Sequence, residues 1–199
     1  MPLKMGARRR SLGDMPPETI AFTLALAGVT LSIFERPVSW PLNMASAALY
    51  AWVFADHRIY ADAALQVFFV VVGGWGWWQW TRGTGAVAGA AVRIGRLGLR
   101  ARAAVVAGWV AGWIVVALAL QRFTDTDVAW LDAFPAVGSV IGQFLLGRKR
   151  IEAWWVWIGV NAVAVALFAY KGLALTAVLY GVFLGLALMG ARRWARVPA

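Results

Sequence analysis

One pattern of apolar, aromatic and amide residues occurs twice in this sequence, about 115 residues apart and inside segments of membrane-spanning length. Asn43 aligns with Asn161, and the residues that follow are Leu49-Tyr50-Ala51 in one copy and Leu167-Phe168-Ala169 in the other. After a shift of four residues, four more pairs align: Leu65 and Leu179, Phe69 and Phe183, Gly76 and Gly190, and Trp80 and Trp194. Substrate sites in membranes commonly lie where such repeats face each other. The repeat therefore indicates a transporter.

The composition places the chain in a membrane. Hydrophobic residues make up 62% of it, with 13 Trp among 199 residues, which is more than a soluble domain of this size needs for its core. The absence of cysteine excludes disulfides and thiolate metal sites. The net charge of +10 would suggest nucleic acid in a soluble protein, but here the basic residues lie between apolar segments. We therefore expect them to set the topology, with the lipid bilayer and no nucleic acid as partner.

Seven segments approach the roughly 20 apolar residues that a spanning helix needs. None shows the period of two that a membrane β-barrel requires, so the sequence predicts an all-α integral membrane protein. The predicted helices are Glu18 to Phe34, Val38 to Ala55, Ile59 to Trp80, Ala103 to Leu120, Val128 to Leu146, Ala153 to Tyr170 and Gly172 to Gly190.

The repeat pairs the first three helices with the last three and leaves the fourth unmatched. Each repeat crosses the membrane three times, so a second repeat joined directly to the first would be inverted. One extra crossing gives both triplets the same orientation. We predict a 3+1+3 bundle of two parallel repeats. Its parts are a basic amino tail (1–17), repeat 1 (18–80), a basic linker with the fourth helix (81–127), repeat 2 (128–191) and a basic carboxyl tail (192–199).

The Lys and Arg distribution predicts a cytoplasmic carboxyl end, because twelve basic residues then lie inside and three in outer loops. The amino tail disagrees, since it places Lys4 and Arg8 to Arg10 outside. The twelve inner residues are Arg36, Arg82, Arg93, Arg96, Arg100, Arg102, Arg148, Lys149, Arg150, Arg192, Arg193 and Arg196.

Several motifs in order resemble the PnuC family of bacterial vitamin transporters. They include Trp40-Pro41-Leu42-Asn43, Gly76-Trp77-Trp78-Gln79-Trp80, Arg148-Lys149-Arg150-Ile151-Glu152 and Trp157-Ile158-Gly159-Val160-Asn161, and the resemblance covers roughly Glu18 to Trp194. It implies a fold like the SWEET sugar transporters, a place in the bacterial cytoplasmic membrane and uptake of nicotinamide riboside. Relatives that carry thiamine, riboflavin or nucleosides leave the substrate open.

Polar residues away from the predicted helix ends are candidates for the substrate site, because an unpartnered amide or hydroxyl is costly in lipid. Asn and Gln match the hydroxyls of a ribose and a carboxamide, although interhelical hydrogen bonding is the competing role. The candidates are Asn43, Gln66, Ser139, Asn161 and Tyr180. Trp157 and, more weakly, Trp40 are candidates for stacking on a cationic heterocycle. We assign Trp75, Trp77, Trp78, Trp80, Trp154 and Trp194 to the interfacial belt.

No Asp, Glu, Lys or Arg lies in the middle of a predicted span. Proton- or sodium-driven carriers usually place such a group there, so we expect facilitated diffusion made unidirectional by a cytoplasmic kinase that phosphorylates the substrate. The family resemblance implies the same trapping. One His and no Cys cannot build a catalytic metal site, so we expect no enzyme, metal or cofactor. A pore or structural bundle remains an alternative, and homo-oligomers remain open.

Overall fold

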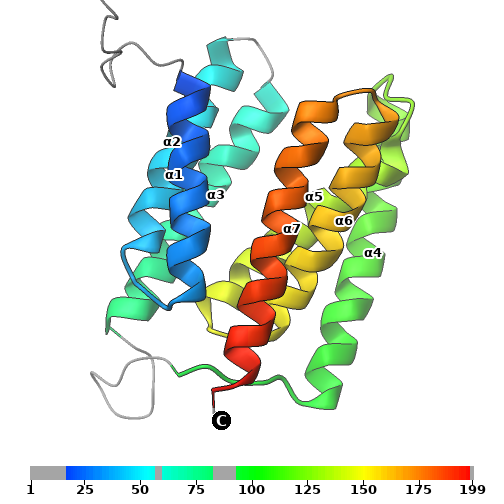
Figure 1. Cartoon of the computed structure of the whole chain (residues 1–199). Coiled ribbons are helices and arrows are strands. Elements are labelled where there is room, and N and C mark those ends of the chain that lie inside the picture. The colour runs from blue at the N-terminus through cyan, green and yellow to red at the C-terminus, as the bar shows by residue number, and fades with distance from the viewer. Residues whose placement is uncertain (1–16, 57–59, 83–92, 198–199) are drawn as a thin grey trace, which may run out of the picture.

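The computed structural model describes residues 17–56, 60–82 and 93–197, which form seven α-helices (Figure 1). The predicted seven helices are confirmed, with α3, α4 and α7 running further than expected. Most of the amino tail, His57 and the first part of the linker lie outside the described residues. The helices are α1 (Pro17–Ile33), α2 (Ser39–Asp56), α3 (Tyr60–Arg82), α4 (Leu99–Phe123), α5 (Ala129–Gly147), α6 (Glu152–Tyr170) and α7 (Ala174–Ala195).

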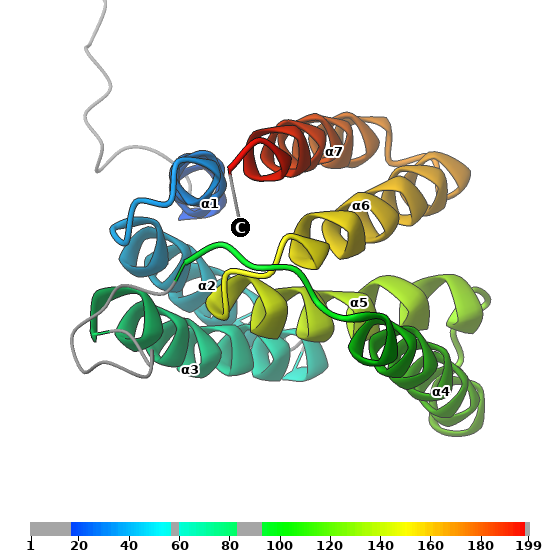
Figure 2. The same ribbon diagram turned by 90° about the horizontal axis from the view of Figure 1, so that it is seen from below.

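Six of the helices form a closed ring, seen end-on in Figure 2. Within each triplet the middle helix packs between its neighbours, α2 between α1 and α3, and α6 between α5 and α7. The triplets then meet at two equivalent seams, α3 against α5 and α7 against α1. The predicted arrangement of two parallel triplets is therefore confirmed.

The fourth helix lies outside this ring and packs mainly against α5, while its Arg102 pairs with Glu152 at the start of α6. Two of its indoles donate hydrogen bonds to α5 carbonyls, Trp109 Nε1 to Phe134 O at 3.1 Å and Trp113 Nε1 to Trp130 O at 2.8 Å. Its other side chains are largely exposed and apolar, as expected for a helix that faces lipid. By length and composition α4, α5 and α6 are each able to cross a membrane. The predicted linker role of α4 is confirmed.

One end of the ring carries most of the basic residues, and we call it the basic end. There α1, α3, α5 and α7 finish while α2, α4 and α6 begin. Residues 93–98 cross it as an extended segment that we call the strap (Figure 2). Gly95 N donates to Lys149 O at 3.0 Å, and Ile151 N donates to Gly95 O at 3.1 Å. Ile94 of the strap is buried in the core, so the strap is part of the packed structure.

The two triplets pack alike at a constant offset of 114 residues. A Cβ at Gly76 would overlap the Trp40 ring, and a Cβ at Gly190 would overlap Trp154. A second set of equivalent contacts follows the same offset: Gly28 meets Asn43, and Gly142 meets Trp157. The alignment of Asn43 with Asn161 is therefore wrong. Asn43 occupies the place of Trp157. The alignment matched the two asparagines because they are identical residues, whereas the close contacts with glycine determine which positions are equivalent in the packing.

Candidate functional site

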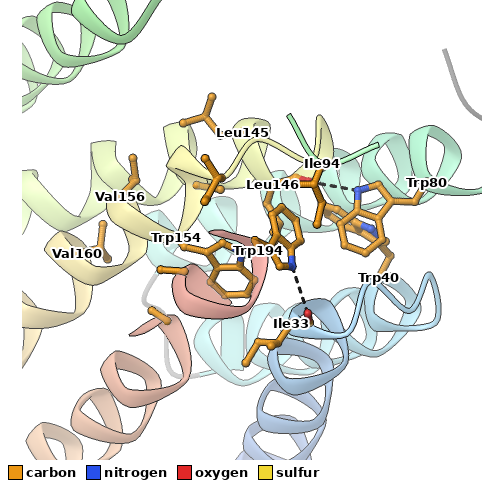
Figure 3. Packing of buried hydrophobic residues seen from close by; sticks show 14 residues of the cluster. Ile33, Trp40, Trp80, Ile94, Leu145, Leu146, Trp154, Val156, Val160 and Trp194 are labelled. Carbon is orange, nitrogen blue, oxygen red and sulfur yellow. Dashed lines mark hydrogen bonds between the residues drawn. The ribbon is translucent and has the colours of Figure 1, made fainter. Parts of the chain in front are cut away.

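Four indoles fill the interior of the ring at its basic end (Figure 3). Trp40, Trp80, Trp154 and Trp194 are each at most 3% exposed and come from α2, α3, α6 and α7. They form two edge-to-face pairs, Trp40 with Trp80 at 5.5 Å and Trp154 with Trp194 at 5.4 Å. The core cluster around them draws buried residues from all six ring helices. This cluster closes the ring at the basic end.

The cluster corrects the assignment of three tryptophans to the interfacial belt. All three lie near helix ends, but each ring points into the ring of helices, where it packs against a glycine or an indole of a facing helix. They are Trp80, Trp154 and Trp194. Trp77 and Trp78 are 44% and 47% exposed, in keeping with a belt position. Trp40 also belongs to the cluster, packed against Gly76 and Trp80, and we leave it out of the proposed substrate site.

Two indole N–H groups of the cluster join the triplets to each other. Trp80 Nε1 at the end of α3 lies 3.1 Å from Gly147 O and 3.2 Å from Leu146 O at the end of α5. Trp194 Nε1 at the end of α7 donates to Ile33 O at the end of α1, at 3.1 Å (Figure 3). Helix-terminal carbonyls lack intrahelical partners, and Gly147 O and Ile33 O accept no backbone hydrogen bond from the described residues, so the indoles satisfy both. The two bonds are equivalent by the 114-residue offset.

An ion pair lies beside these hydrogen bonds and also spans the triplets. Lys149 Nζ lies 3.1 Å from Glu35 Oε2 and 4.8 Å from the centre of the Trp80 ring. Both residues follow the end of a first-of-triplet helix and have positive φ, 56° for Glu35 and 49° for Lys149. They too are 114 residues apart. Lys149 is 7% exposed, whereas the side chain of Glu35 is 34% exposed, so the pair is partly removed from solvent. The basic end is thus closed by packing, hydrogen bonds and charge.

Further along α6 from the basic end, two candidate residues, Trp157 and Asn161, lie on the face that holds Trp154. Asn161 is two helical turns, or about 10 Å, further along the helix than Trp154. Asn161 Nδ2 donates to Trp157 O at 2.7 Å, and the side chain is 5% exposed. Its carbonyl oxygen accepts no hydrogen bond from the described residues. Trp157 Nε1 is also buried without a partner there. An unpaired buried polar group costs free energy. The indole N–H of Trp157 as a donor and the amide oxygen of Asn161 as an acceptor therefore favour a polar ligand at this part of α6.

The remaining candidates are distributed around the ring. Ser139 lies mid-way along α5, and Gln66 and Tyr180 each lie six residues into α3 and α7 from the opposite end. All three are partly buried. The Tyr180 ring stacks on Phe168 at 5.1 Å. The structure thus brings Asn161 and Trp157 together and surrounds them with helices that bear the other three. Asn43 instead packs against Gly28, between α1 and α2.

Sequence reasoning missed the closure of the basic end. The signal was present, because Glu35 and Lys149 stand at the same offset as Trp80 and Trp194, in loops that follow equivalent helices. It was hidden because both residues were counted only as topology signals or helix-end charges.

Six helices in two parallel triplets, closed at one end and with unpaired polar groups inside the ring, are the architecture of a membrane transporter. The chain belongs to the nicotinamide mononucleotide transporter family, because the sequence model of that family matches residues 16–196.

Individual relatives agree with this assignment. The chain is 29% identical over 169 residues to the riboflavin/roseoflavin transporter RibM of Streptomyces davaonensis, covering 83% of this chain and 79% of that protein. It is 26% identical to the nicotinamide riboside transporter PnuC of Escherichia coli, covering 89% and 84% of the two chains. The crystal structure of the vitamin B3 transporter PnuC shares the fold with a TM-score of 0.69 at 24% identity, over 90% of this chain and 80% of that one.

Proposed function

We propose that this protein imports nicotinamide riboside across the bacterial cytoplasmic membrane by alternating access. The observation that carries the proposal is a pair of polar atoms on α6 that have no partner among the described residues, the buried Trp157 Nε1 and the amide oxygen of Asn161. An amide oxygen accepts from a ribose hydroxyl or a carboxamide N–H, and the indole N–H donates to a hydroxyl or carbonyl oxygen. The face of Trp157 attracts a cationic pyridinium ring.

Riboflavin is the second candidate substrate. The relative RibM, at 29% identity, is named for riboflavin and roseoflavin. A flavin also presents carbonyl oxygens, N–H groups and a flat ring to the same amide and indole. The two substrates differ in charge, since the pyridinium of nicotinamide riboside is cationic and the flavin is neutral. Binding strength across a panel of vitamins separates them.

The transport cycle follows from the closed basic end, which we place on the cytoplasmic side because the basic residues gather there. In the described helices the charged residues lie in the end turns, so no mid-span ion couples movement of the substrate to a gradient. Import is then facilitated diffusion, and phosphorylation by a cytoplasmic kinase retains the product. This role requires no catalytic residue in the chain.

The test is calorimetry of the purified protein with nicotinamide riboside, thiamine, riboflavin, a plain nucleoside and nicotinamide mononucleotide. Selective binding of nicotinamide riboside, with no binding of its phosphorylated form, is the expected result. Preference for riboflavin would reassign the substrate and keep the mechanism. Binding of none of these compounds would contradict the proposed site.

The closure of the basic end gives a separate prediction. Replacing Glu35 with Gln removes the ion pair to Lys149, so the basic end opens more often. The chain lacks cysteine, so Ser139→Cys provides a single reporter inside the ring. We expect a membrane-impermeant maleimide, added from the basic side, to label it severalfold faster in the Glu35→Gln background.

The matched control is Asp132→Asn. It breaks the ion pair between Lys171 Nζ and Asp132 Oδ2, which are 3.9 Å apart at the opposite end. Labelling from the basic side should then be unchanged. Equal labelling in the Glu35→Gln and parent proteins would show that the ion pair does not hold this end closed.

A further inference from the structure

A hollow of about 460 Å³ lies at the basic end of the α1–α7 seam. Its walls combine four apolar side chains, those of Ile33, Phe34, Met189 and Val197, with three guanidinium groups. Phe34 and Met189 are 45% and 52% exposed, and the guanidinium of Arg193 lies 4.5 Å from the centre of the Phe34 ring. Arg192 and Arg196 complete the basic wall.

The three arginines of this hollow lack a carboxylate partner among the described residues. Glu35 also lines it, but its carboxylate pairs with Lys149 at 3.1 Å. Within the described part of the chain, Arg192, Arg193 and Arg196 form no ion pair with any Asp or Glu. Three guanidinium groups around a cavity without a carboxylate partner favour an anion, and their planar donor geometry suits phosphate oxygens.

The equivalent place in the α3–α5 seam is filled by a side chain of the protein itself. Trp75 stands 114 residues before Met189, and its ring packs so closely on Gly147 that a Cβ there would overlap it. Phe144 lies 5.6 Å from the same ring, and the Arg148 guanidinium lies 5.9 Å from its centre. The two seams therefore differ at this contact, where Met189 and Ile33 of one correspond to Trp75 and Gly147 of the other.

The surroundings indicate what kind of anion fits. Further from the basic end than the arginines, the outer surface of α7 carries three apolar side chains that are 39% to 52% exposed. They are Met189, Leu188 and Val182. A soluble phosphate would use the guanidinium groups but leave these apolar side chains uncovered. A phospholipid uses both, with its phosphate at the arginines and its acyl chains along the helix. Basic pockets at the ends of membrane helices are typical sites for such headgroups.

We propose that the α1–α7 hollow binds the headgroup of an anionic phospholipid, such as phosphatidylglycerol, through Arg192 and Arg193. The site joins the two triplets at their basic end, so a bound lipid stabilises that seam. The lipid is distinct from the transported substrate, and the site lies outside the ring.

The test measures binding of phosphatidylglycerol to the delipidated full-length protein by native mass spectrometry, with phosphatidylcholine as the neutral comparison. In the double variant Arg192→Gln/Arg193→Gln we expect roughly thirtyfold weaker binding of phosphatidylglycerol, and phosphatidylcholine should not change. The matched control is Arg82→Gln/Arg148→Gln, which removes the same charge beside the filled seam and should leave binding intact. Equal loss in both double variants would show non-specific attraction and overturn the proposal.

A second variant keeps the charge and removes the space. Met189→Trp introduces the residue that fills the other seam, opposite Ile33 instead of a glycine. Protein of this variant that elutes as a single monodisperse species should have lost specific phosphatidylglycerol binding. Unchanged lipid binding by this variant would overturn the assignment to the hollow. Complete displacement of the lipid by millimolar inorganic phosphate would instead identify a soluble-anion site and also overturn it.

Discussion

Replacing Asn161 with leucine is expected to abolish substrate binding and uptake while the protein stays folded. The two side chains are similar in size, but leucine cannot accept the hydrogen bond that the free amide oxygen offers a ligand. Loss of a buried hydrogen bond to a ligand costs about 1–3 kcal/mol, which corresponds to roughly ten- to hundredfold in affinity. Calorimetry and uptake of labelled nicotinamide riboside measure the effect.

Asn43→Leu is the matched control for this prediction. Asn43 packs against Gly28 between α1 and α2, so its substitution should leave substrate affinity unchanged. Elution as a single monodisperse species in detergent establishes that each variant is folded. Normal uptake by Asn161→Leu would remove Asn161 from the site, whereas equal losses in both variants would restore the two asparagines as a functional pair.

Two glycine substitutions should have the largest effects on stability. At Gly76 and Gly190 an added methyl group would overlap the rings of Trp40 and Trp154, which are wedged in the cluster. Overpacking of this kind costs about 1–3 kcal/mol. Alanine would otherwise stabilise a helix by about 0.5–1 kcal/mol relative to glycine. We therefore expect Gly76→Ala and Gly190→Ala to unfold at lower temperature than the parent protein.

The same helices supply the controls. Gly74 on α3 and Gly185 on α7 have open space where a Cβ would stand. Gly74→Ala and Gly185→Ala should leave the unfolding temperature in detergent unchanged or raise it. If the variants at positions 76 and 190 were as stable as these controls, the tight contact between glycine and indole would not exist in solution.

The sequence predicted the helices well but not the closure between them. Spanning helices are recognisable because lipid demands long apolar segments, whatever their partners. In a membrane, however, an inward and an outward face differ little in hydrophobicity, so the packed surfaces are set by shape. Trp154 and Trp194 illustrate this, since their positions near helix ends suit an interfacial belt as well as a buried cluster.

The structure likewise keeps some of the predicted site residues together and places others elsewhere. Asn43 and Asn161 were both predicted from the cost of a polar group at depth, and Trp40 and Trp157 as rings that stack on a cationic heterocycle. The structure brings Asn161 and Trp157 into contact on α6. The structure places Asn43 and Trp40 elsewhere, because neither the depth of a residue nor its spacing registers a glycine on the facing helix. The contacts with Gly28 and Gly76 depend on backbone approach, which side-chain patterns do not encode.

The ion pair at the basic end bears on how such a chain came to exist. If the triplets were two identical subunits related by a two-fold axis, each position near the axis would face a copy of itself. Glutamate would then oppose glutamate, or lysine would oppose lysine, and the like charges would repel. Here Glu35 and Lys149 occupy equivalent positions yet carry opposite charges. Because both positions belong to one chain, they are able to differ, and this contact therefore holds opposite charges that a symmetric homodimer could not place there.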